Sequence, residues 1–201
     1  MSLFYLIRHG ETATVGKTVA GRSPGVHLTE KGRKQAEGLI ARLSDVQINQ
    51  IFCSPMERTR DTAAPLAEKL GLKVNLREEL NEIDFGHWTG KSLDELHGKE
   101  AWQLYNQFRS GFRIPGGELL SEVQGRTVRF FDEIRREYRD QTIAVFSHKD
   151  TLRALLCYFL GMPLDFILRF EISPASISIL SLKDYGPELL LLNSTDSLQI
   201  Q

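Results

Sequence analysis

Apolar residues follow two patterns along the chain: short uninterrupted runs, and longer segments in which they recur at helical spacing. The short runs have the length and composition of buried strands, and they predict strands at residues 3–7, 48–53, 73–76, 142–146, 167–172, 176–182 and 188–193. The helical spacing predicts helices that begin near residues 29 and 56, one or two short helices within 92–108, and further helices at 118–138 and 151–160.

The alternation of strands and helices predicts the fold class. It indicates an α/β fold with three layers, α/β/α, in which helices cover both faces of a mostly parallel central sheet. Residues 142–146 form the clearest central strand, because they are apolar enough to be buried on both faces. The chain has no internal repeat, low-complexity run or linker, so we expect one domain over residues 1–201, with a loose polar tail from about residue 194.

Composition narrows the range of partners. The 201 residues are 41% hydrophobic and 25% charged, with a formal net charge of −1, as in an ordinary globular domain. This balance gives no electrostatic reason to expect a nucleic acid or an anionic membrane as partner. The first ten residues lack the pattern of a signal peptide, and no apolar window approaches the ~18 residues of a membrane span, so we expect a cytoplasmic protein. Cys53 and Cys157 lie far apart in apolar surroundings and are expected to be reduced core residues.

Candidate chemistry begins where the first strand ends. Arg8, His9 and Gly10 follow the apolar run directly, and ligands of open α/β sheets bind outside the carboxyl ends of strands. Arginine offers a planar fork of donors that suits phosphate oxygens, and glycine lets the backbone turn sharply or approach a ligand. His9 could be a nucleophile, a general acid or base, or another donor. An anionic, phosphate-like ligand is the expectation.

Two further strand ends carry similar residues. Ser54 and Pro55 follow the second strand and suit a helix cap and first helical position, which would place Arg58 in the first turn of that helix. A helix N-terminus already favours an anion. His148 follows the central strand, just before another helix. Three strand ends therefore deliver cations or imidazoles to the same edge of the predicted sheet.

Five motifs occur in order along the chain: Arg8-His9-Gly10-Glu11-Thr12, Ser54-Pro55-x-x-Arg58, Glu82-x-Asp84-x-Gly86-x-Trp88-x-Gly90, Pro115-Gly116-Gly117-Glu118 and Ser147-His148. In this order they resemble the histidine phosphatase superfamily, in the branch related to cofactor-dependent phosphoglycerate mutase. The likeness covers about residues 3–190. It implies the phosphoglycerate mutase-like fold and phosphoryl transfer.

The resemblance also implies roles. His9 would attack phosphorus and become a phosphohistidine, and Glu82 would protonate the leaving alcohol and later activate water. Arg8, Arg58 and His148 would surround the phosphoryl group and stabilise the charge on its oxygens. Further candidates for binding the phosphate or substrate are Gly10, Arg22 and Lys149, although a solvated loop charge is the competing interpretation of Arg22.

Physical chemistry agrees with these roles. Phosphoryl transfer needs charge neutralisation and in-line positioning, which two arginines and two imidazoles can supply without a metal or other cofactor. The second ring nitrogen of His9 should donate to a fixed acceptor such as a backbone carbonyl. Glu82 should have a raised pKa, from burial or a neighbouring anion, and it is favoured over Asp84 as the acid. Arg153 is interpreted as a charge on the helix surface or behind the site.

Departures from the mutase pattern favour hydrolysis. Thr14-Val15 stands where mutases usually have Trp-Asn, and Lys149-Asp150 where many relatives have Gly-Gly. The segment between Glu82 and His148 shows no long arginine-rich insertion that would shield a phosphoenzyme from water. We therefore expect a phosphatase.

The alternatives are a 2,3-bisphosphoglycerate-dependent phosphoglycerate mutase and, more remotely, an inactive phosphate-binding module. The expected substrate is a small phosphorylated metabolite. A sugar phosphate, a phosphoglycerate-like acid and a nucleotide-derived ester such as α-ribazole phosphate all remain open. A homodimer is possible, because an apolar strand of the last third could form an exposed sheet edge.

Overall fold

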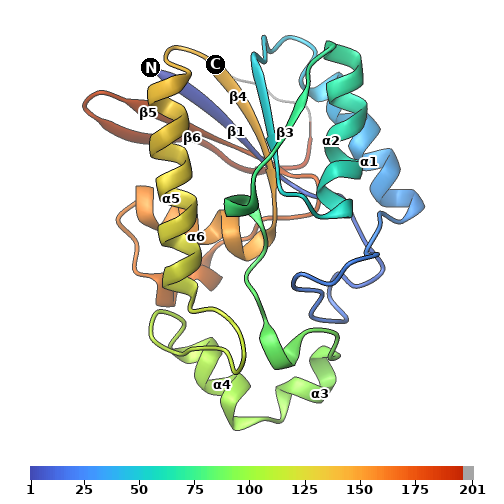
Figure 1. The fold of residues 1–201 in the computed structure, drawn as a ribbon, viewed down its shortest axis with the longest axis vertical. Coiled ribbons are helices and arrows are strands. Elements are labelled where there is room, and N and C mark those ends of the chain that lie inside the picture. Colours follow the sequence, from blue (N-terminus) through green and yellow to red (C-terminus); the bar gives the residue numbers. More distant parts are fainter. Residues whose placement is uncertain (197–201) are drawn as a thin grey trace.

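A single mixed sheet organises the computed structural model, which describes residues 1–196. Its strand order is β3-β2-β4-β1-β5-β6 (Figure 1). The six strands are β1 (Ser2–Arg8), β2 (Gln50–Cys53), β3 (Val74–Leu76), β4 (Thr142–Ser147), β5 (Ile177–Lys183) and β6 (Gly186–Ser194). The strands from β3 to β1 pair in parallel, and β5 and β6 add two antiparallel pairings. The predicted fold, with a mostly parallel sheet, is confirmed.

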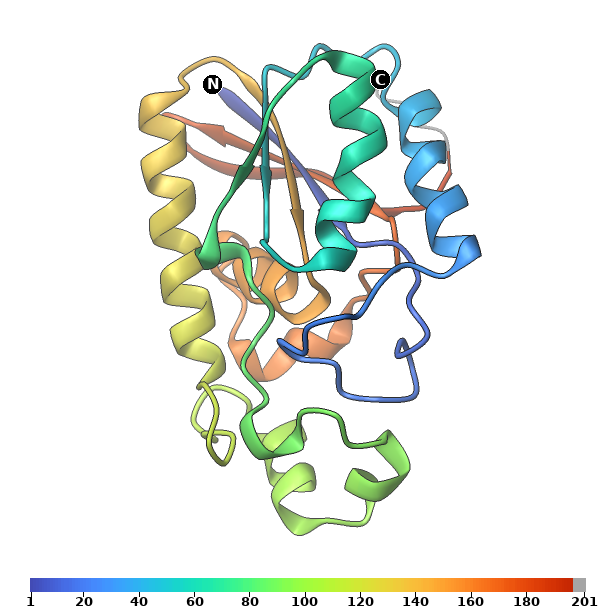
Figure 2. The same cartoon turned by 45° about the vertical axis from the view of Figure 1, so that its right-hand side comes forward.

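Helices cover both faces of the sheet (Figures 1 and 2). One face carries α1 (Glu30–Arg42) and α2 (Glu57–Leu70), and the other carries α5 (Leu120–Glu137) and α6 (Lys149–Phe159). The short helices α3 (Leu93–His97) and α4 (Glu100–Gln107) lie beyond the carboxyl ends of the parallel strands. Within residues 1–196, no helix combines the length and apolar character needed to cross a membrane.

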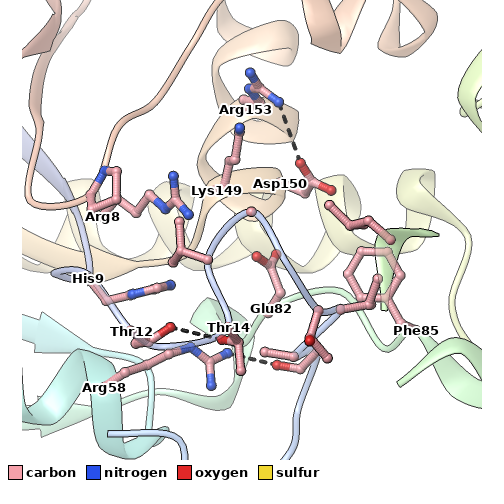
Figure 3. A pocket seen from close by; sticks show the side chains of 18 of the residues that line it. Arg8, His9, Thr12, Thr14, Arg58, Glu82, Phe85, Lys149, Asp150 and Arg153 are labelled. Atoms are coloured by element: carbon pink, nitrogen blue, oxygen red, sulfur yellow. Dashed lines mark hydrogen bonds and ion pairs between the residues drawn. The ribbon is translucent and has the colours of Figure 1, made fainter. Parts of the chain in front are cut away.

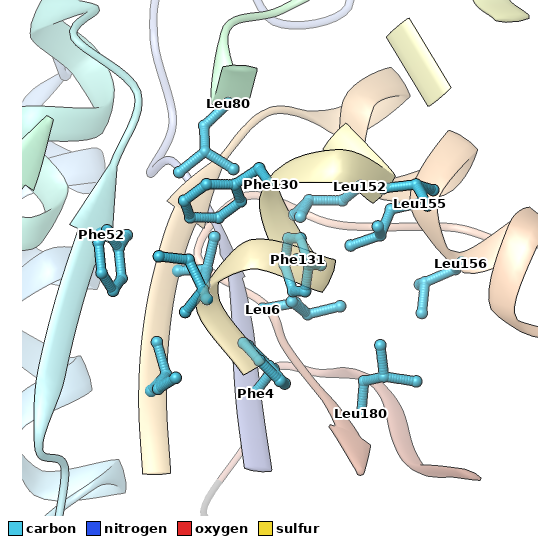
Figure 4. Close-up of a cluster of buried hydrophobic side chains, with 14 of the residues drawn as sticks. Phe4, Leu6, Phe52, Leu80, Phe130, Phe131, Leu152, Leu155, Leu156 and Leu180 are labelled. Carbon is cyan, nitrogen blue, oxygen red and sulfur yellow. The ribbon is translucent and has the colours of Figure 1, made fainter. Parts of the chain in front are cut away.

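The core forms on both faces because alternate residues of each central strand point to opposite sides. In β1, Phe4 and Leu6 belong to the cluster under α5 and α6, where Phe130 and Phe131 pack on them (Figure 4). Tyr5 and Ile7 belong to the cluster under α1 and α2. Side chains on both sides therefore fix the position of β1, and with it the residues at its carboxyl end.

A third apolar cluster lies beyond the sheet edge and supports α3 and α4. Its centre is Trp88, whose ring centroid is 5.2 Å from that of Trp102 and 5.4 Å from that of Tyr105. Ser92 and Glu95 form a capping box at the start of α3. This cluster anchors one side of the cavity described below.

Two local predictions are wrong. Residues 167–172 form no strand; the chain makes a 3₁₀ helix at Leu164–Arg169, in which Leu164 and Ile167 are buried three positions apart, as that helix type requires. The helix after β2 begins at Glu57, close to the predicted residue 56, but its cap position is Met56 rather than Ser54, whose hydroxyl donates to Asn81. Of the predicted loose tail, residues 197–201 lie outside the described part.

Candidate active site

The two histidines of the motifs lie side by side because their strands are neighbours. Arg8 pairs with Ser147 in the parallel register of β1 and β4, and the His9 N–H donates to the Ser147 carbonyl at 3.0 Å. The centroids of the His9 and His148 rings are 5.3 Å apart. The sheet register therefore brings together residues that are far apart in the sequence.

A backbone hydrogen bond fixes the tautomer of His9. Its Nδ1 lies 2.8 Å from the carbonyl oxygen of Gly10, so Nδ1 carries the proton and Nε2 keeps a lone pair. Burial and the neighbouring Arg8 and Arg58 charges hold the pKa of His9 well below its usual value. The ring is therefore neutral at pH 7 with a nucleophilic Nε2. The expected backbone acceptor is confirmed.

His148 is oriented by a chain of hydrogen bonds that the sequence did not reveal. Its Nε2 lies 2.9 Å from Ser54 Oγ, and that hydroxyl donates to Asn81 Oδ1 at 2.8 Å. The side chain is fully buried, and burial followed by the charge of Arg58 lowers the pKa of His148. Ser54 thus fixes the imidazole, which explains a serine four residues before a site arginine better than helix capping does.

Each of the two arginines is held by one backbone carbonyl. Arg8 Nη1 donates to the Ile172 carbonyl and Arg58 Nη2 to the Gly21 carbonyl, both at 2.7 Å. Both side chains are more than nine-tenths buried, and burial lowers the pKa of each guanidinium from a value so high that both stay charged. Two partly desolvated cations beside the neutral His9 form a strong site for a dianion.

These groups open onto one cavity of about 390 Å³ (Figure 3). Arg8, His9, Arg58 and Glu82 line it together, whereas the predicted site residue His148 is fully buried beside His9 and is not part of the lining. Residues 14–16 and 18–21 of the loop after β1 cover one side, and apolar side chains complete the lining: Phe85, Leu93, Trp102 and Leu168. The cavity thus combines a cationic part, lined by Arg8 and Arg58, with an apolar part.

Glu82 has the environment of a proton donor. Its Oε1 accepts from the Ile83 N–H at 3.1 Å and lies 3.1 Å from the Thr151 hydroxyl, whereas Oε2 has no partner among the described residues. Burial, and then the negative charge of Asp150, raise the pKa of Glu82 above its ordinary value. The expected raised pKa is confirmed, and Oε2 is the oxygen free to carry the proton.

Three side chains from distant parts of the chain hold the backbone of Glu82. Arg22 Nε donates to the Glu82 carbonyl at 2.9 Å, and Arg126 Nη2 donates to the Asn81 carbonyl at 2.7 Å. Glu118 connects the two, since it pairs with Arg22 at 2.8 Å and Arg126 at 3.3 Å. We call Arg22, Glu118 and Arg126 the loop clamp. It fixes a segment that has no strand or helix to position it.

The Pro-Gly-Gly-Glu turn packs directly on this segment. A Cβ at Gly117 would lie 2.3 Å from the Asp84 carbonyl oxygen, and one at Gly86 would lie 2.4 Å from the Pro115 carbonyl oxygen. The Glu118 carboxylate accepts the Asp84 N–H at 2.9 Å. The glycines allow two backbones to touch, and the turn thereby seats the residue that carries the acid.

Three predicted binding residues have other immediate partners. Gly10 does not line the cavity; its N–H donates to Thr62 Oγ1 at 2.9 Å, and a Cβ there would lie 2.7 Å from the Gly32 carbonyl oxygen. Arg22 does not line the cavity either, because its guanidinium binds the Glu82 carbonyl and the Glu118 carboxylate. Lys149 does line the cavity, and its ammonium pairs with Glu171 at 2.6 Å.

A charged wall completes the cavity; we use this name for Arg109, Lys149, Asp150, Arg153 and Glu171. Of the two places interpreted for Arg153, the helix surface is wrong, since the residue is 3% exposed and lies among the residues around the cavity. Arg109 and Glu171 were missed altogether, and no local signal marks them, because they come from irregular segments around the cavity. Among residues 1–196, no group of three or more His, Cys, Asp or Glu side chains could hold a metal ion.

Comparisons with known proteins agree with this geometry. A model of the histidine phosphatase superfamily (branch 1) matches residues 4–195. Phosphoserine phosphatase 1 of Hydrogenobacter thermophilus is 33% identical over 94% of this chain and 91% of that protein. Probable phosphoglycerate mutase GpmB of Erwinia tasmaniensis is 33% identical over 87% of this chain and 82% of that protein. The solved α-ribazole phosphatase of Shigella flexneri superposes with a TM-score of 0.85, at 29% identity over 96% of both chains.

Proposed function

This chain belongs to the histidine phosphatase superfamily, branch 1, and we propose that it hydrolyses the phosphomonoester of a small metabolite through a phosphohistidine on His9. The observation that carries the proposal is the pairing of two protonation states in one cavity. His9 is neutral with a free Nε2, and Glu82 has a raised pKa with a free Oε2. A nucleophile and an acid in these states are what cleavage of an alkyl phosphate needs.

The first half-reaction transfers the phosphoryl group to the protein. His9 Nε2 attacks phosphorus, the P–N bond forms as the P–O ester bond breaks, and the Glu82 proton goes to the leaving oxygen. Arg8 and Arg58 neutralise the charge on the equatorial oxygens, with His148 behind them. The Nδ1–H bond to Gly10 persists throughout and stabilises the positive charge that develops on the ring.

The second half-reaction returns the protein to its starting state. Glu82, now a carboxylate, takes a proton from water as the water oxygen attacks phosphorus. The P–N bond breaks, inorganic phosphate leaves, and His9 is neutral again. One residue thus serves as acid and then as base, as microscopic reversibility requires.

We place hydrolysis ahead of mutase activity because of the cavity lining. Val15 lines the cavity and offers a bound phosphate no hydrogen bond. Between Glu82 and His148 the chain builds only the 3₁₀ turn at Gly86–Trp88, the short α3 and α4, and α5. An open phosphohistidine is exposed to water, which favours its hydrolysis.

The test is turnover by the purified protein in the presence of EDTA, on a panel of phosphomonoesters. Phosphate release together with a ³²P label that is acid-labile and base-stable, and that is lost in His9→Ala, would support the proposal. Conversion of 3-phosphoglycerate to 2-phosphoglycerate that depends on 2,3-bisphosphoglycerate would replace it with the mutase. Retention of phosphoesters without turnover would indicate the binding module.

We further propose that the chain acts as one domain in the cytoplasm and forms a homodimer. Sedimentation of the purified chain tests the last point, since a monomer at micromolar concentration would contradict it.

A further inference from the structure

Lys149, Asp150 and Arg153 of the charged wall lie on the side of the cavity away from Arg58 (Figure 3). A phosphoryl group held between Arg58 and His9 directs its leaving group toward this side. The members of the wall alternate in charge. Arg109 pairs with Asp150 at 3.2 Å, Asp150 lies 3.8 Å from Arg153, Arg153 pairs with Glu171 at 2.8 Å, and Glu171 pairs with Lys149 at 2.6 Å. Lys149 and Asp150 are the two positions at which the chain departs from Gly-Gly.

The wall divides into a buried part and an open part. The side chains of Arg109, Asp150 and Arg153 are 6%, 14% and 4% exposed. Those of Lys149 and Glu171 are 33% and 49% exposed. Lys149 and Glu171 are therefore the ion pair of the wall that a ligand in the cavity can reach.

Buried structure fixes both members of this open pair. Lys149 is the first residue of α6, directly after the strand end that carries His148. Glu171 is held by Arg153, which is anchored in turn on the Phe170 carbonyl. The ammonium of Lys149 has three donors, of which Glu171 takes one, and the Glu171 oxygens keep lone pairs beyond those used by Lys149 and Arg153. A fixed cation and a fixed anion, both with spare capacity, therefore face the cavity.

We infer that Lys149 and Glu171 form a subsite for a leaving group with one positive and one negative charge, so that the substrate is a phosphorylated amino acid. The carboxylate binds Lys149 and the ammonium binds Glu171, as one ion pair lying against another. A leaving group with a single charge would meet one partner and be repelled by the other. This inference rests on the proposed function for the direction of the substrate in the cavity, with its phosphoryl group at His9.

A matched series of phosphomonoesters tests the subsite. O-phosphoserine carries both charges, 3-phosphoglycerate has a hydroxyl in place of the ammonium, phosphoethanolamine lacks the carboxylate, and glycerol 3-phosphate lacks both. We expect kcat/KM to be highest for phosphoserine, by roughly 10- to 100-fold over each singly charged analogue. Equal values across the series, or a preference for a bulky heterocyclic ester, would overturn the inference.

Two variants assign the charges. Lys149→Met should lower the ratio of phosphoserine to phosphoethanolamine hydrolysis about 10-fold, because only phosphoserine has a carboxylate to lose its partner. Glu171→Gln should lower the ratio of phosphoserine to 3-phosphoglycerate hydrolysis by a similar factor. The matched controls are Lys34→Met and Glu30→Gln, which alter a solvent-exposed ion pair on α1 and should leave both ratios unchanged. Unchanged ratios in the wall variants would overturn the assignment.

Binding separates this inference from the proposed function. His9→Ala removes the nucleophile and keeps the wall, so calorimetry on that variant measures the affinity of intact phosphoserine without turnover. Tighter binding of phosphoserine than of 3-phosphoglycerate and phosphoethanolamine supports the subsite even if no ester is hydrolysed by the wild type. Hydrolysis of p-nitrophenyl phosphate without any such preference supports the phosphatase and overturns the subsite.

Discussion

The nucleophile and the acid are held by different kinds of structure. His9 follows a central strand that is packed on both faces, and its backbone is paired with the neighbouring β4. Glu82 lies in a segment without regular structure, and its backbone is fixed by the side chains of the loop clamp. Sheet pairing thus places one reactive group, while long-range polar contacts of three side chains place the other. Substitutions at the nucleophile and substitutions that remove or misplace the acid should therefore change the kinetics in different ways.

The largest effect is expected from removing the nucleophile. His9→Ala should lower kcat by about 10⁴-fold or more for every ester, because no other described group can form the covalent intermediate. Rapid-quench kinetics and ³²P labelling of the purified variant measure this loss. Residual labelling above 1% of the wild-type level would place the nucleophile elsewhere, and the thermal midpoint of the variant checks that it is folded.

Removal of the acid should depend on the leaving group. Glu82→Gln should lower kcat/KM by roughly 10²–10⁴-fold for glycerol 3-phosphate, whose alkoxide needs a proton. The loss for p-nitrophenyl phosphate should be less than about 10-fold, because p-nitrophenolate leaves without one. The ratio of the two losses is the measurement. Equal losses for both esters would mean that Glu82 supports binding rather than proton transfer.

Weakening the loop clamp should also lower kcat/KM more for an alkyl ester than for p-nitrophenyl phosphate, but by a smaller factor than Glu82→Gln. Glu118→Gln weakens the contacts to Arg22 and Arg126, so we expect a loss of about 10-fold for glycerol 3-phosphate and a smaller one for p-nitrophenyl phosphate. The matched control is Glu122→Gln, four residues further on, whose carboxylate pairs with the exposed Arg113 outside the cavity. A clamp variant that slowed both esters equally would show that the clamp positions the phosphate instead.

The same contrast explains how much of the molecule the sequence predicts. The strand end at His9 is predictable, because an apolar run, a polar break and a glycine are all local signals. The neighbourhood of β1 and β4, and hence of His9 and His148, follows from the family resemblance and the fold class. The tautomer of His9 and the raised pKa of Glu82 follow from the chemistry that the roles require.

The rest depends on contacts across the sequence. The partners of Arg22, 60 and 96 positions away, leave no trace in its neighbours, so its interpretation as a phosphate ligand is not supported by the geometry. Ser54 looks like a helix cap because serine has that local preference, and only the fold reveals that its hydroxyl holds His148. The run at 167–172 is apolar enough for a strand, and apolarity alone does not distinguish a strand from a 3₁₀ turn.

The smallest expected effect is a change in the pH dependence of activity. It tests whether Asp150 of the charged wall acts electrostatically on Glu82. Asp150 is the second cause, after burial, of the raised pKa of Glu82, and hydrolysis of alkyl esters needs Glu82 protonated and His9 neutral. Activity should therefore rise with pH as His9 loses its proton, below its ordinary value of 6.5, and fall again as Glu82 ionises, above its ordinary value of 4.5. The falling limb should be weak for p-nitrophenyl phosphate, which needs no acid.

Asp150→Asn removes the neighbouring negative charge, so the pKa of Glu82 should fall and the alkaline limb of kcat/KM should move to lower pH. The acid limb, which belongs to His9, should stay in place. Profiles for glycerol 3-phosphate, with Asp45→Asn on the exposed surface as control, measure both limbs. A shift of the acid limb alone would mean that Asp150 acts on His9 rather than on Glu82. A shift of the alkaline limb alone shows that the charged wall sets the proton affinity of a residue whose position the loop clamp fixes.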